Sequence, residues 1–160
     1  MTLLLRPYAP ADRRAAIALI HQLNMFEDAI SGDRAKDLAA AEACLDLDLG
    51  KAATQGGAVI LALDGTEVVG MMAFLIDLPE PYLSAQVGKV AQIAELVVDE
   101  RCRGQGIGTA LLEEAERLAR SLDVSRLRIG VIAGNGIARR AYERFGFRPA
   151  AIELSKEVAR

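Results

Sequence analysis

The sequence predicts an α/β protein of the α+β type, folded as one domain over residues 1–160. A chain of this length suits one domain, and its hydrophobic content of 52% is sufficient for a core. Apolar residues recur with helical spacing in some segments and form short continuous runs in others. A turn signal, Asp64-Gly65, joins two of these runs into a hairpin. By themselves these patterns predict a domain of helices and strands with an internal hairpin.

The first half of the chain predicts three strands and two helices. A short apolar segment at 2–6 indicates the first strand. Pro10 and Asp12 then mark the start of a helix whose apolar residues follow helical spacing, and a second helix repeats that spacing over 35–53. The two strands of the hairpin are expected at 58–63 and 67–78.

The second half alternates strands and helices. Pro79 and Pro81 indicate a loop over 78–88. The segment 105–122 carries an apolar stripe opposite a charged face, which is typical of a helix that packs on a sheet. The remaining expected elements are strands at 89–98, 126–132 and 147–156 and a helix at 135–145.

A glycine-rich loop is the most informative segment of the chain. Arg103-Gly104-Gln105-Gly106-Ile107-Gly108 follows an apolar strand and opens the helix of residues 105–122. Alternate glycines let the backbone approach a ligand and turn several N–H groups toward one point. A helix N-terminus attracts anions, and an arginine side chain has forked donors that suit phosphate oxygens. The loop therefore predicts a phosphate site.

The glycine spacing distinguishes between kinds of phosphate loop. It fits neither the Gly-x-Gly-x-x-Gly dinucleotide pattern nor a Walker A loop, since no Gly-Lys-Ser/Thr triplet is present. The pattern is Arg-x-x-Gly-x-Gly, and a second motif follows it: Asn135, Tyr142 and the run Phe145-Gly146-Phe147. Together, in this order, the two motifs resemble the GNAT superfamily of N-acetyltransferases over nearly the whole chain.

The resemblance implies a specific fold and cosubstrate. The fold would be a mixed, largely antiparallel sheet of about six to seven strands with helices on both faces. The cosubstrate would be acetyl-CoA, with no metal, and the strand around Leu96 would part from the next strand so that its backbone pairs with the pantetheine. The cofactor-binding residues implied in this way are Leu96, Val97, Val98, Arg103, Gly104, Gln105, Gly106, Ile107, Gly108, Thr109, Asn135 and Tyr142.

Acetyl transfer to an amine needs a base for the amine and an acid for the leaving thiolate. Glu95 interrupts an apolar strand, where partial burial would raise the pKa of its carboxyl toward that of a general base. The alternative is that Glu95 simply faces solvent. Tyr142 is the expected acid, or alternatively a core tyrosine. Glu27 and Asp28 are competing bases or ligands for a cationic substrate, and they could equally be solvated.

With these residues, the resemblance implies an N-acetyltransferase that moves the acetyl group of acetyl-CoA to an amine of a small molecule or peptide, by direct transfer in a ternary complex. No Ser or Cys stands beside a His or in a Gly-x-Ser-x-Gly turn as an acyl-enzyme would require. Two alternatives stay open. One is a non-catalytic acyl-CoA-binding module of the same fold, and the other is a hydrolase built on His21.

The composition does not indicate several other classes of protein. A net charge of −3 with mixed signs does not indicate a nucleic-acid or anionic-membrane surface, and no apolar run approaches the length of a membrane span. Two cysteines, one histidine and no Cys-x-x-Cys predict neither a disulfide framework nor a zinc site. We expect a cytoplasmic protein that binds an amine substrate, with a homodimer left open.

Overall fold

The computed structural model of the chain describes residues 2–158. Within them, five strands form one mixed sheet in the order β1-β2-β3-β4-β5. The first four pair antiparallel with their neighbours, and β5 pairs parallel to β4. The strands are β1 (Leu3–Pro7), β2 (Gly57–Asp64), β3 (Glu67–Ile76), β4 (Lys89–Val98) and β5 (Val124–Ile129).

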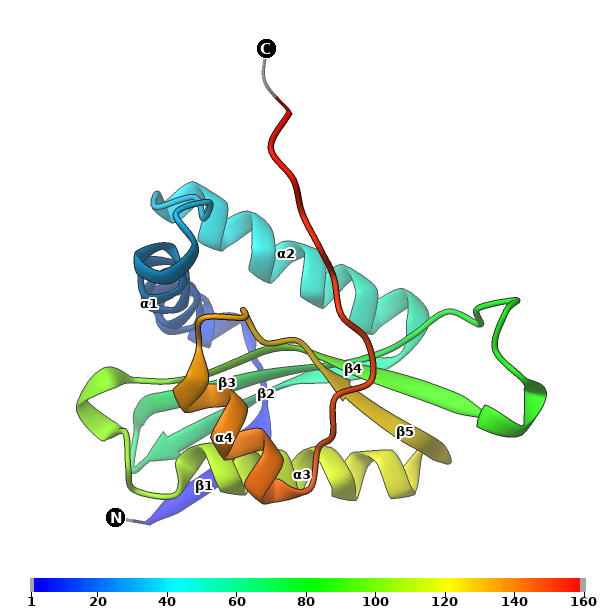
Figure 1. Cartoon of the computed structure of the whole chain (residues 1–160). Helices are drawn as coiled ribbons and strands as arrows, with labels where there is room; N and C mark the ends of the chain where they lie inside the picture. Colours follow the sequence, from blue (N-terminus) through cyan, green and yellow to red (C-terminus); the bar gives the residue numbers. More distant parts are fainter. Residues whose placement is uncertain (1, 159–160) are drawn as a thin grey trace.

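Helices cover both faces of this sheet, as expected (Figure 1). On one face lie α1 (Arg13–Ser31) and α2 (Leu38–Gln55), and on the other lie α3 (Ile107–Ser121) and α4 (Gly136–Phe145). Short 3-10 turns, η1 (Pro10–Asp12), η2 (Ala85–Val87) and η3 (Glu100–Cys102), connect some of these elements. No helix within residues 2–158 combines the length and the apolar character that crossing a membrane requires.

Two hydrophobic cores, one on each face, hold the layers together. The core under α1 and α2 includes Ile20, Leu45 and Met71, all essentially inaccessible to solvent. The core under α3 includes Phe74 and Leu111, which are also essentially inaccessible to solvent. Because successive strand residues point to opposite faces, the three central strands β2, β3 and β4 contribute to both cores. The sheet is therefore a rigid frame on which loops can position reactive groups.

The expected last strand, 147–156, is absent, and the sheet has five strands in the described residues rather than six to seven. Helix α4 ends at Gly146 (φ 115°), where the Phe147 N–H bonds back to the Tyr142 carbonyl. Pro149, which has no N–H, follows, and the chain then leaves the body of the molecule (Figure 1). Ile152 and Leu154 alternate with polar residues as in a strand, but no strand of the described residues pairs with them.

Two predicted boundaries shift for local reasons. Helix α3 begins at Ile107 rather than at residue 105, because Gly106 has the left-handed φ of 84° and caps the helix. Strand β5 spans 124–129 rather than 126–132, so the segment up to the start of α4 is a turn. Both shifts lengthen loops that follow the C-terminal ends of two neighbouring strands, the loop from β4 to α3 and the loop from β5 to α4.

Candidate active site

The candidate site lies where β4 and β5 part. Their parallel pairing starts at Lys89 and Val124 and ends at Ile93 and Ile129, whereas β4 continues to Val98. Beyond Ile93, the edge of β4 that faced β5 has no strand neighbour among the described residues. Backbone N–H and C=O groups along that edge are therefore available to a ligand that can pair as a strand would.

A β-bulge at Ala94 decides which face each later residue of β4 occupies. The register against β3 shifts there, so Ala94 is the extra residue. Ile93 belongs to the core under α3, and regular alternation would direct Glu95 to the same side. After the bulge, Leu96 packs against the α3 core and Val97 lies in the α1–α2 core. Glu95 therefore faces α1 and α2.

Glu95 is partly buried in this position. Burial, with smaller contributions from the carboxylates of Asp48 and Glu27, raises the pKa of Glu95 to about 8, while Arg34 partly opposes this rise. Its carboxyl group thus exchanges a proton near neutral pH, which an ordinary glutamate does not. Such a group can act as a general base or acid at working pH.

Asp48 is a neighbour of Glu95 that the sequence analysis missed. It lies on α2 with 4% of its surface exposed, and its Oδ2 atom has no hydrogen-bond partner within residues 2–158. Burial raises the pKa of Asp48 to about 6, against the opposing charge of Lys51. The available signal was its helical spacing, since Ala41, Leu45 and Asp48 form the buried stripe of α2. An acid in an apolar stripe is costly without a partner.

Arg103 connects the glycine loop to two neighbouring elements. Its Cζ atom lies 5.1 Å from the centroid of the Phe26 ring on α1. Its Nε donates a hydrogen bond of 3.3 Å to the carbonyl oxygen of Val98 at the end of β4. No ion pair occupies its guanidinium within the described part of the chain. The group is held in place while its remaining donors stay available to an anion.

The loop uses glycine for its backbone conformation. Gly104 (φ 76°) and Gly106 (φ 84°) both occupy the left-handed region, and an added Cβ at either would meet nothing within 4 Å. The Ala110 N–H donates to the Gly106 carbonyl at 3.0 Å, which starts the hydrogen-bond ladder of α3. The N–H groups of the first turn consequently have no acceptor within the helix. These N–H groups could donate to an anion such as a phosphate.

The first turn of α3 is anchored on one side and open on the other. Ile107 is 1% exposed and fixes the helix start in the core. Gly108 lies close to β4, since a Cβ there would be 3.8 Å from Cγ2 of Val98. Gln105 and Thr109 are exposed, on the side where a ligand would approach.

Tyr142 lies on α4, on the face of the sheet that α3 covers. With Leu96 and Val98 it packs against the core under α3, and its ring centroid is 6.1 Å from that of Phe147 in an edge-on arrangement. Burial, with a smaller contribution from the Glu27 carboxylate, raises the pKa of Tyr142 to about 12. The phenol therefore stays protonated at neutral pH and can donate its proton.

Asn135 is the N-cap of α4. Its Oδ1 atom accepts a hydrogen bond of 3.1 Å from the Ala138 N–H, and only 9% of the residue is exposed. The preceding loop runs close to α1, because a Cβ at Gly134 would lie 2.6 Å from Cγ2 of Ile30. The C-terminal half of α1 thus contacts the α4 loop as well as Arg103.

Glu27 and Asp28 lie on this half of α1 and are both paired with cations. The Arg34 Nε donates to Glu27 Oε2 at 2.8 Å. Asp28 forms an ion pair of 2.8 Å with Lys36 Nζ and accepts the Arg34 N–H, and these contacts lower its pKa. The charge of Asp28 is thus balanced by Lys36, which lies between α1 and α2. Glu27, in contrast, also raises the pKa values of Glu95 and Tyr142.

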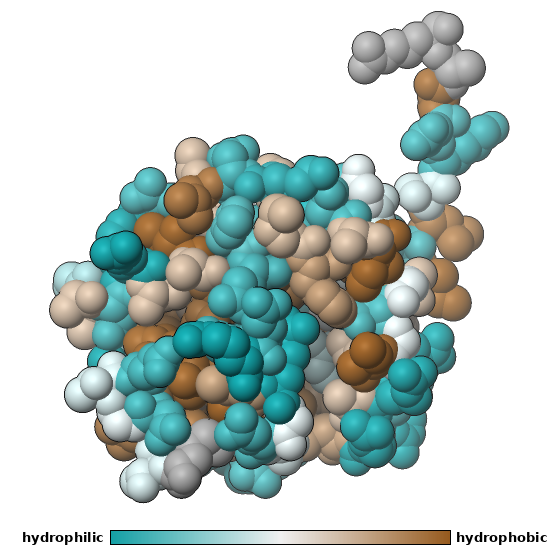
Figure 2. All heavy atoms as spheres, turned by 90° about the vertical axis from the view of Figure 1, so that its left-hand side faces the viewer, coloured by the Kyte–Doolittle hydropathy of each residue, from teal (hydrophilic) through white to brown (hydrophobic). Residues whose placement is uncertain are grey.

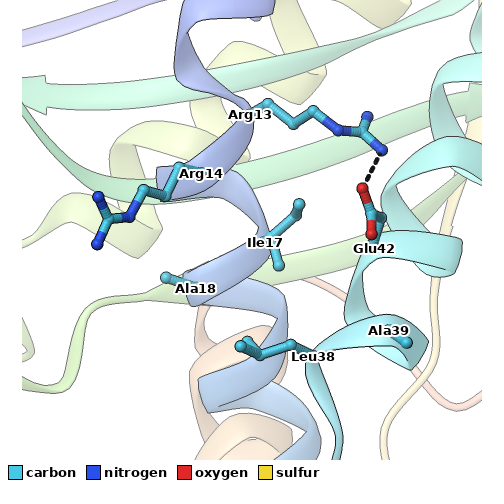
Figure 3. A pocket seen from close by; sticks show the side chains of 7 residues that line it. All are labelled: Arg13, Arg14, Ile17, Ala18, Leu38, Ala39 and Glu42. Atoms are coloured by element: carbon cyan, nitrogen blue, oxygen red, sulfur yellow. Dashed lines mark hydrogen bonds and ion pairs between the residues drawn. The ribbon is translucent and has the colours of Figure 1, made fainter.

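The groove between α1 and α2 and the residue His21 are not among the candidate site residues. A groove of about 600 Å³ between α1 and α2 is lined by residues such as Ile17 and Leu38 and is bridged by the Arg13–Glu42 ion pair of 2.7 Å (Figure 3). His21 Nε2 lies 3.0 Å from the carbonyl oxygen of Lys36. Within residues 2–158, no group of three or more His, Cys, Asp or Glu side chains could hold a metal ion.

Two sequence comparisons bear on the family. The model of the acetyltransferase (GNAT) family matches residues 21–147. The "Putative phosphinothricin acetyltransferase YwnH" of Bacillus subtilis (strain 168) is 32% identical over 78 residues, or 49% of this chain. The match covers 47% of that protein, so the chain spans about half the length of the curated relative.

Solved structures share the fold over almost the whole chain. A transcriptional regulator from Bacillus halodurans C-125 has a TM-score of 0.77 at 20% identity, covering 98% of this chain and 100% of the other. Glucosamine-6-phosphate N-acetyltransferase from Arabidopsis thaliana has a TM-score of 0.70 at 18% identity, covering 99% and 100%. At these identities the likeness concerns the fold alone. The family match over residues 21–147 shows that the chain belongs to the GNAT acetyltransferase family.

Proposed function

We propose that the protein is an N-acetyltransferase that moves the acetyl group of acetyl-CoA to an amine of a small molecule or peptide, by direct transfer in a ternary complex. The observation that carries this proposal is the parting of β4 from β5 next to the Arg103–Gly108 loop. Val98 links the open strand edge to the anion-binding helix start. It is the last residue of β4, and its carbonyl oxygen accepts the hydrogen bond from Arg103. The family to which the chain belongs supports the same activity.

Acetyl-CoA would be held at two places. Its diphosphate would bind to Arg103 and to the backbone N–H groups from Gly104 to Thr109. Its pantetheine amides would pair with the free edge of β4 along Leu96–Val98, and a backbone N–H near Val97 would stabilise negative charge on the acetyl oxygen. Asn135 would contact the pantetheine beside its capping bond. The thioester supplies the activated acetyl group.

Two side chains of the protein would move the protons. The carboxylate of Glu95 accepts a proton from the ammonium of the acceptor, directly or through water, which frees the nitrogen lone pair. The nitrogen then bonds to the acetyl carbon as the carbon–sulfur bond breaks. The Tyr142 hydroxyl donates its proton to the departing sulfur, a role supported by a pKa that keeps it protonated. The acetylated nitrogen loses its second proton to the resulting tyrosinate, directly or through water, which gives the neutral amide and restores the phenol.

The acceptor would approach from the α1–α2 side, where carboxylates gather. Glu27 and Asp48 both raise the pKa of Glu95, so a positively charged group placed among them would relieve mutual repulsion. Asp28 would contribute less than Glu27, because Lys36 already neutralises it. An amine that arrives as an ammonium therefore suits this side of the sheet.

Thiol release measured across a panel of primary amines tests the proposal. We expect release that depends on both acetyl-CoA and an amine, with intersecting double-reciprocal lines when both concentrations are varied. Parallel lines would contradict direct transfer and indicate an acyl-enzyme. If acetyl-CoA raises the melting temperature but no amine supports thiol release, the chain is a non-catalytic binding module instead.

A further inference from the structure

Helix α1 continues its apolar stripe beyond the hydrophobic core. Leu19 lies in the core under α1 and α2, and Leu23 packs against that core. Phe26 and Ile30 follow at intervals of three and four residues, which places them on the same face of the helix. Neither side chain belongs to a core of the described residues. The stripe therefore ends in two apolar side chains whose contacts lie outside the cores.

These two side chains lie against the loops that the proposed function assigns to acetyl-CoA. Ile30 is close to the loop before α4, since a Cβ added at Gly134 would be 2.6 Å from its Cγ2 atom. The guanidinium of Arg103 lies over the ring of Phe26, and the 5.1 Å between Cζ and the ring centroid is within the range of a cation–π contact. In Figure 1, α1 and the loop from β4 to α3 lie on one side of the molecule. Figure 2 shows that side, where hydrophobic patches stand between hydrophilic side chains.

The guanidinium of Arg103 has two contacts, and both leave the same atoms free. Its Nε atom donates a hydrogen bond of 3.3 Å to the carbonyl oxygen of Val98, and the Phe26 ring covers it from one side. Within residues 2–158, its two terminal nitrogens donate no hydrogen bond and join no ion pair. An exposed arginine loses rotamer freedom when it binds a ligand, and this loss weakens binding. The ring reduces the loss by restricting the side chain before the ligand arrives.

An aromatic ring can hold a guanidinium without occupying its donors. The negative face of the ring attracts the cation, whereas a carboxylate in the same place would accept hydrogen bonds and compete with phosphate oxygens. Glu27, the next residue along α1, is paired with Arg34 instead. Arg103 consequently keeps both its charge and its terminal donors for an anion.

We propose that Phe26 is a positioning residue for the cosubstrate, whose ring holds the Arg103 guanidinium in place to bind the diphosphate of acetyl-CoA. The inference rests on the proposed function, because it takes Arg103 as a ligand of the diphosphate. It gives α1, which lies on the acceptor side of the sheet, a part in the affinity for acetyl-CoA. The ring should then matter only for ligands that carry the diphosphate.

Calorimetric titration with CoA and turnover with two acetyl donors test the proposal. Phe26→Leu should raise the Kd for CoA and the KM for acetyl-CoA about three- to fivefold, because the cation–π attraction is lost. The kcat should not fall, and kcat/KM for acetylpantetheine, which lacks the diphosphate, should stay unchanged. Phe26→Tyr keeps an aromatic face and should retain the wild-type affinity. Met25→Leu, at an exposed position of the same helix, is the matched control and should bind CoA as the wild type does.

A double-mutant cycle shows whether the ring acts through Arg103. In an Arg103→Gln background, the further substitution Phe26→Leu should change the Kd for CoA by less than about twofold. Four results would overturn the inference alone: an equal loss in both backgrounds, an equal loss with acetylpantetheine, an equal loss in Phe26→Tyr, or a CoA affinity that Phe26→Leu leaves unchanged or increases. A wild-type chain that binds no CoA would refute the proposed function and the inference together.

Discussion

At the scale of the residue, the protonation of Glu95 depends on a single extra backbone position. The bulge at Ala94 turns the carboxyl group from the α3 face to the α1–α2 face of the sheet. There it meets Asp48, which is itself buried and has an unpartnered oxygen in the described structure. Burial disfavours the charge of Glu95, and the carboxylate of Asp48 adds to this effect. The raised pKa of Glu95 is thus a property of packing rather than of sequence neighbours.

Glu95→Gln should lower kcat/KM for the amine by about 100-fold or more, because the amide cannot accept the proton. If the Glu95 carboxylate is the base, as proposed, kcat/KM should rise with pH up to the pKa of about 8 and then level off. A pH–rate profile with several amines measures this. Glu113→Gln, on the exposed face of α3, is the control and should keep the wild-type profile. A wild-type profile in Glu95→Gln would assign the base to another group.

Tyr142→Phe should lower kcat by about 10²-fold and leave the KM for acetyl-CoA nearly unchanged, because it removes a proton donor and little packing. The hydroxyl has no hydrogen-bond acceptor within residues 2–158, so the melting temperature should change little. Phe147→Leu, which alters the ring packed against Tyr142, is the control for packing alone. Steady-state kinetics with a thiol-reactive dye measure both variants, and full turnover in Tyr142→Phe would exclude it as the acid.

At the scale of the element, the glycine loop is defined by backbone angles and the helix by an anchored first residue. Gly106 takes a left-handed φ immediately before α3, and Ile107 is buried directly after it. The loop can therefore vary its conformation little while the helix start stays in the core. A fixed start keeps the N–H groups of the first turn directed at one region of space.

Gly106→Ala should weaken acetyl-CoA binding about fivefold, because a side chain at φ 84° is strained by about 1 kcal/mol and the loop shifts to relieve it. Gly50→Ala is the matched control: Gly50 lies inside α2 with open space around it and no positive φ. That substitution should raise the free energy of unfolding by roughly 0.5–1 kcal/mol and leave binding unchanged. Calorimetric titration with CoA and chemical denaturation measure both effects. Equal CoA affinity in Gly106→Ala and the wild type would remove the loop from the binding site.

The elements show how far the sequence could predict this molecule. Apolar periodicity and the Asp64-Gly65 turn predicted the hairpin and the strand 89–98, because these depend on local alternation. The bulge at Ala94 depends on pairing with β3 and leaves no local signal. The expected strand 147–156 has the right alternation, but a strand also needs a neighbour, and the sequence does not state whether one is available.

At the scale of the whole molecule, α1 joins the separate parts of the candidate site. Its second half contacts Arg103 through Phe26 and approaches the loop before α4 through Ile30. Its Glu27 influences the protonation of both Glu95 and Tyr142. No sequence motif indicated these contacts, since the residues involved lie far apart along the chain. The sequence identified the loop and the two proton-transfer candidates, and the fold supplies the helix between them.

Burial of Asp48 and Glu95 also makes the stability of the whole molecule depend on pH. Their folded pKa values, about 6 and about 8, lie above the ordinary values of 3.8 and 4.5. Both acids therefore favour folding most when protonated, below their ordinary values, and this contribution is lost as pH rises through about 6 and then about 8. Asp99 acts in the opposite sense: its pairing with Arg101 lowers its pKa to about 2, so its contribution is lost as pH falls from 3.8 toward 2.

We accordingly expect the free energy of unfolding to be highest near the ordinary pKa values of these two acids and to fall as pH rises from there to about 8. Asp48→Asn/Glu95→Gln should flatten this fall and stabilise the protein at pH 9, because neither amide is charged there. Urea denaturation across this range measures the difference. Asp46→Asn is the matched control, since Asp46 lies on the same helix but is exposed and paired with Arg13. If the double variant and the wild type lose stability in parallel as pH rises, the buried acids are not the source of the dependence.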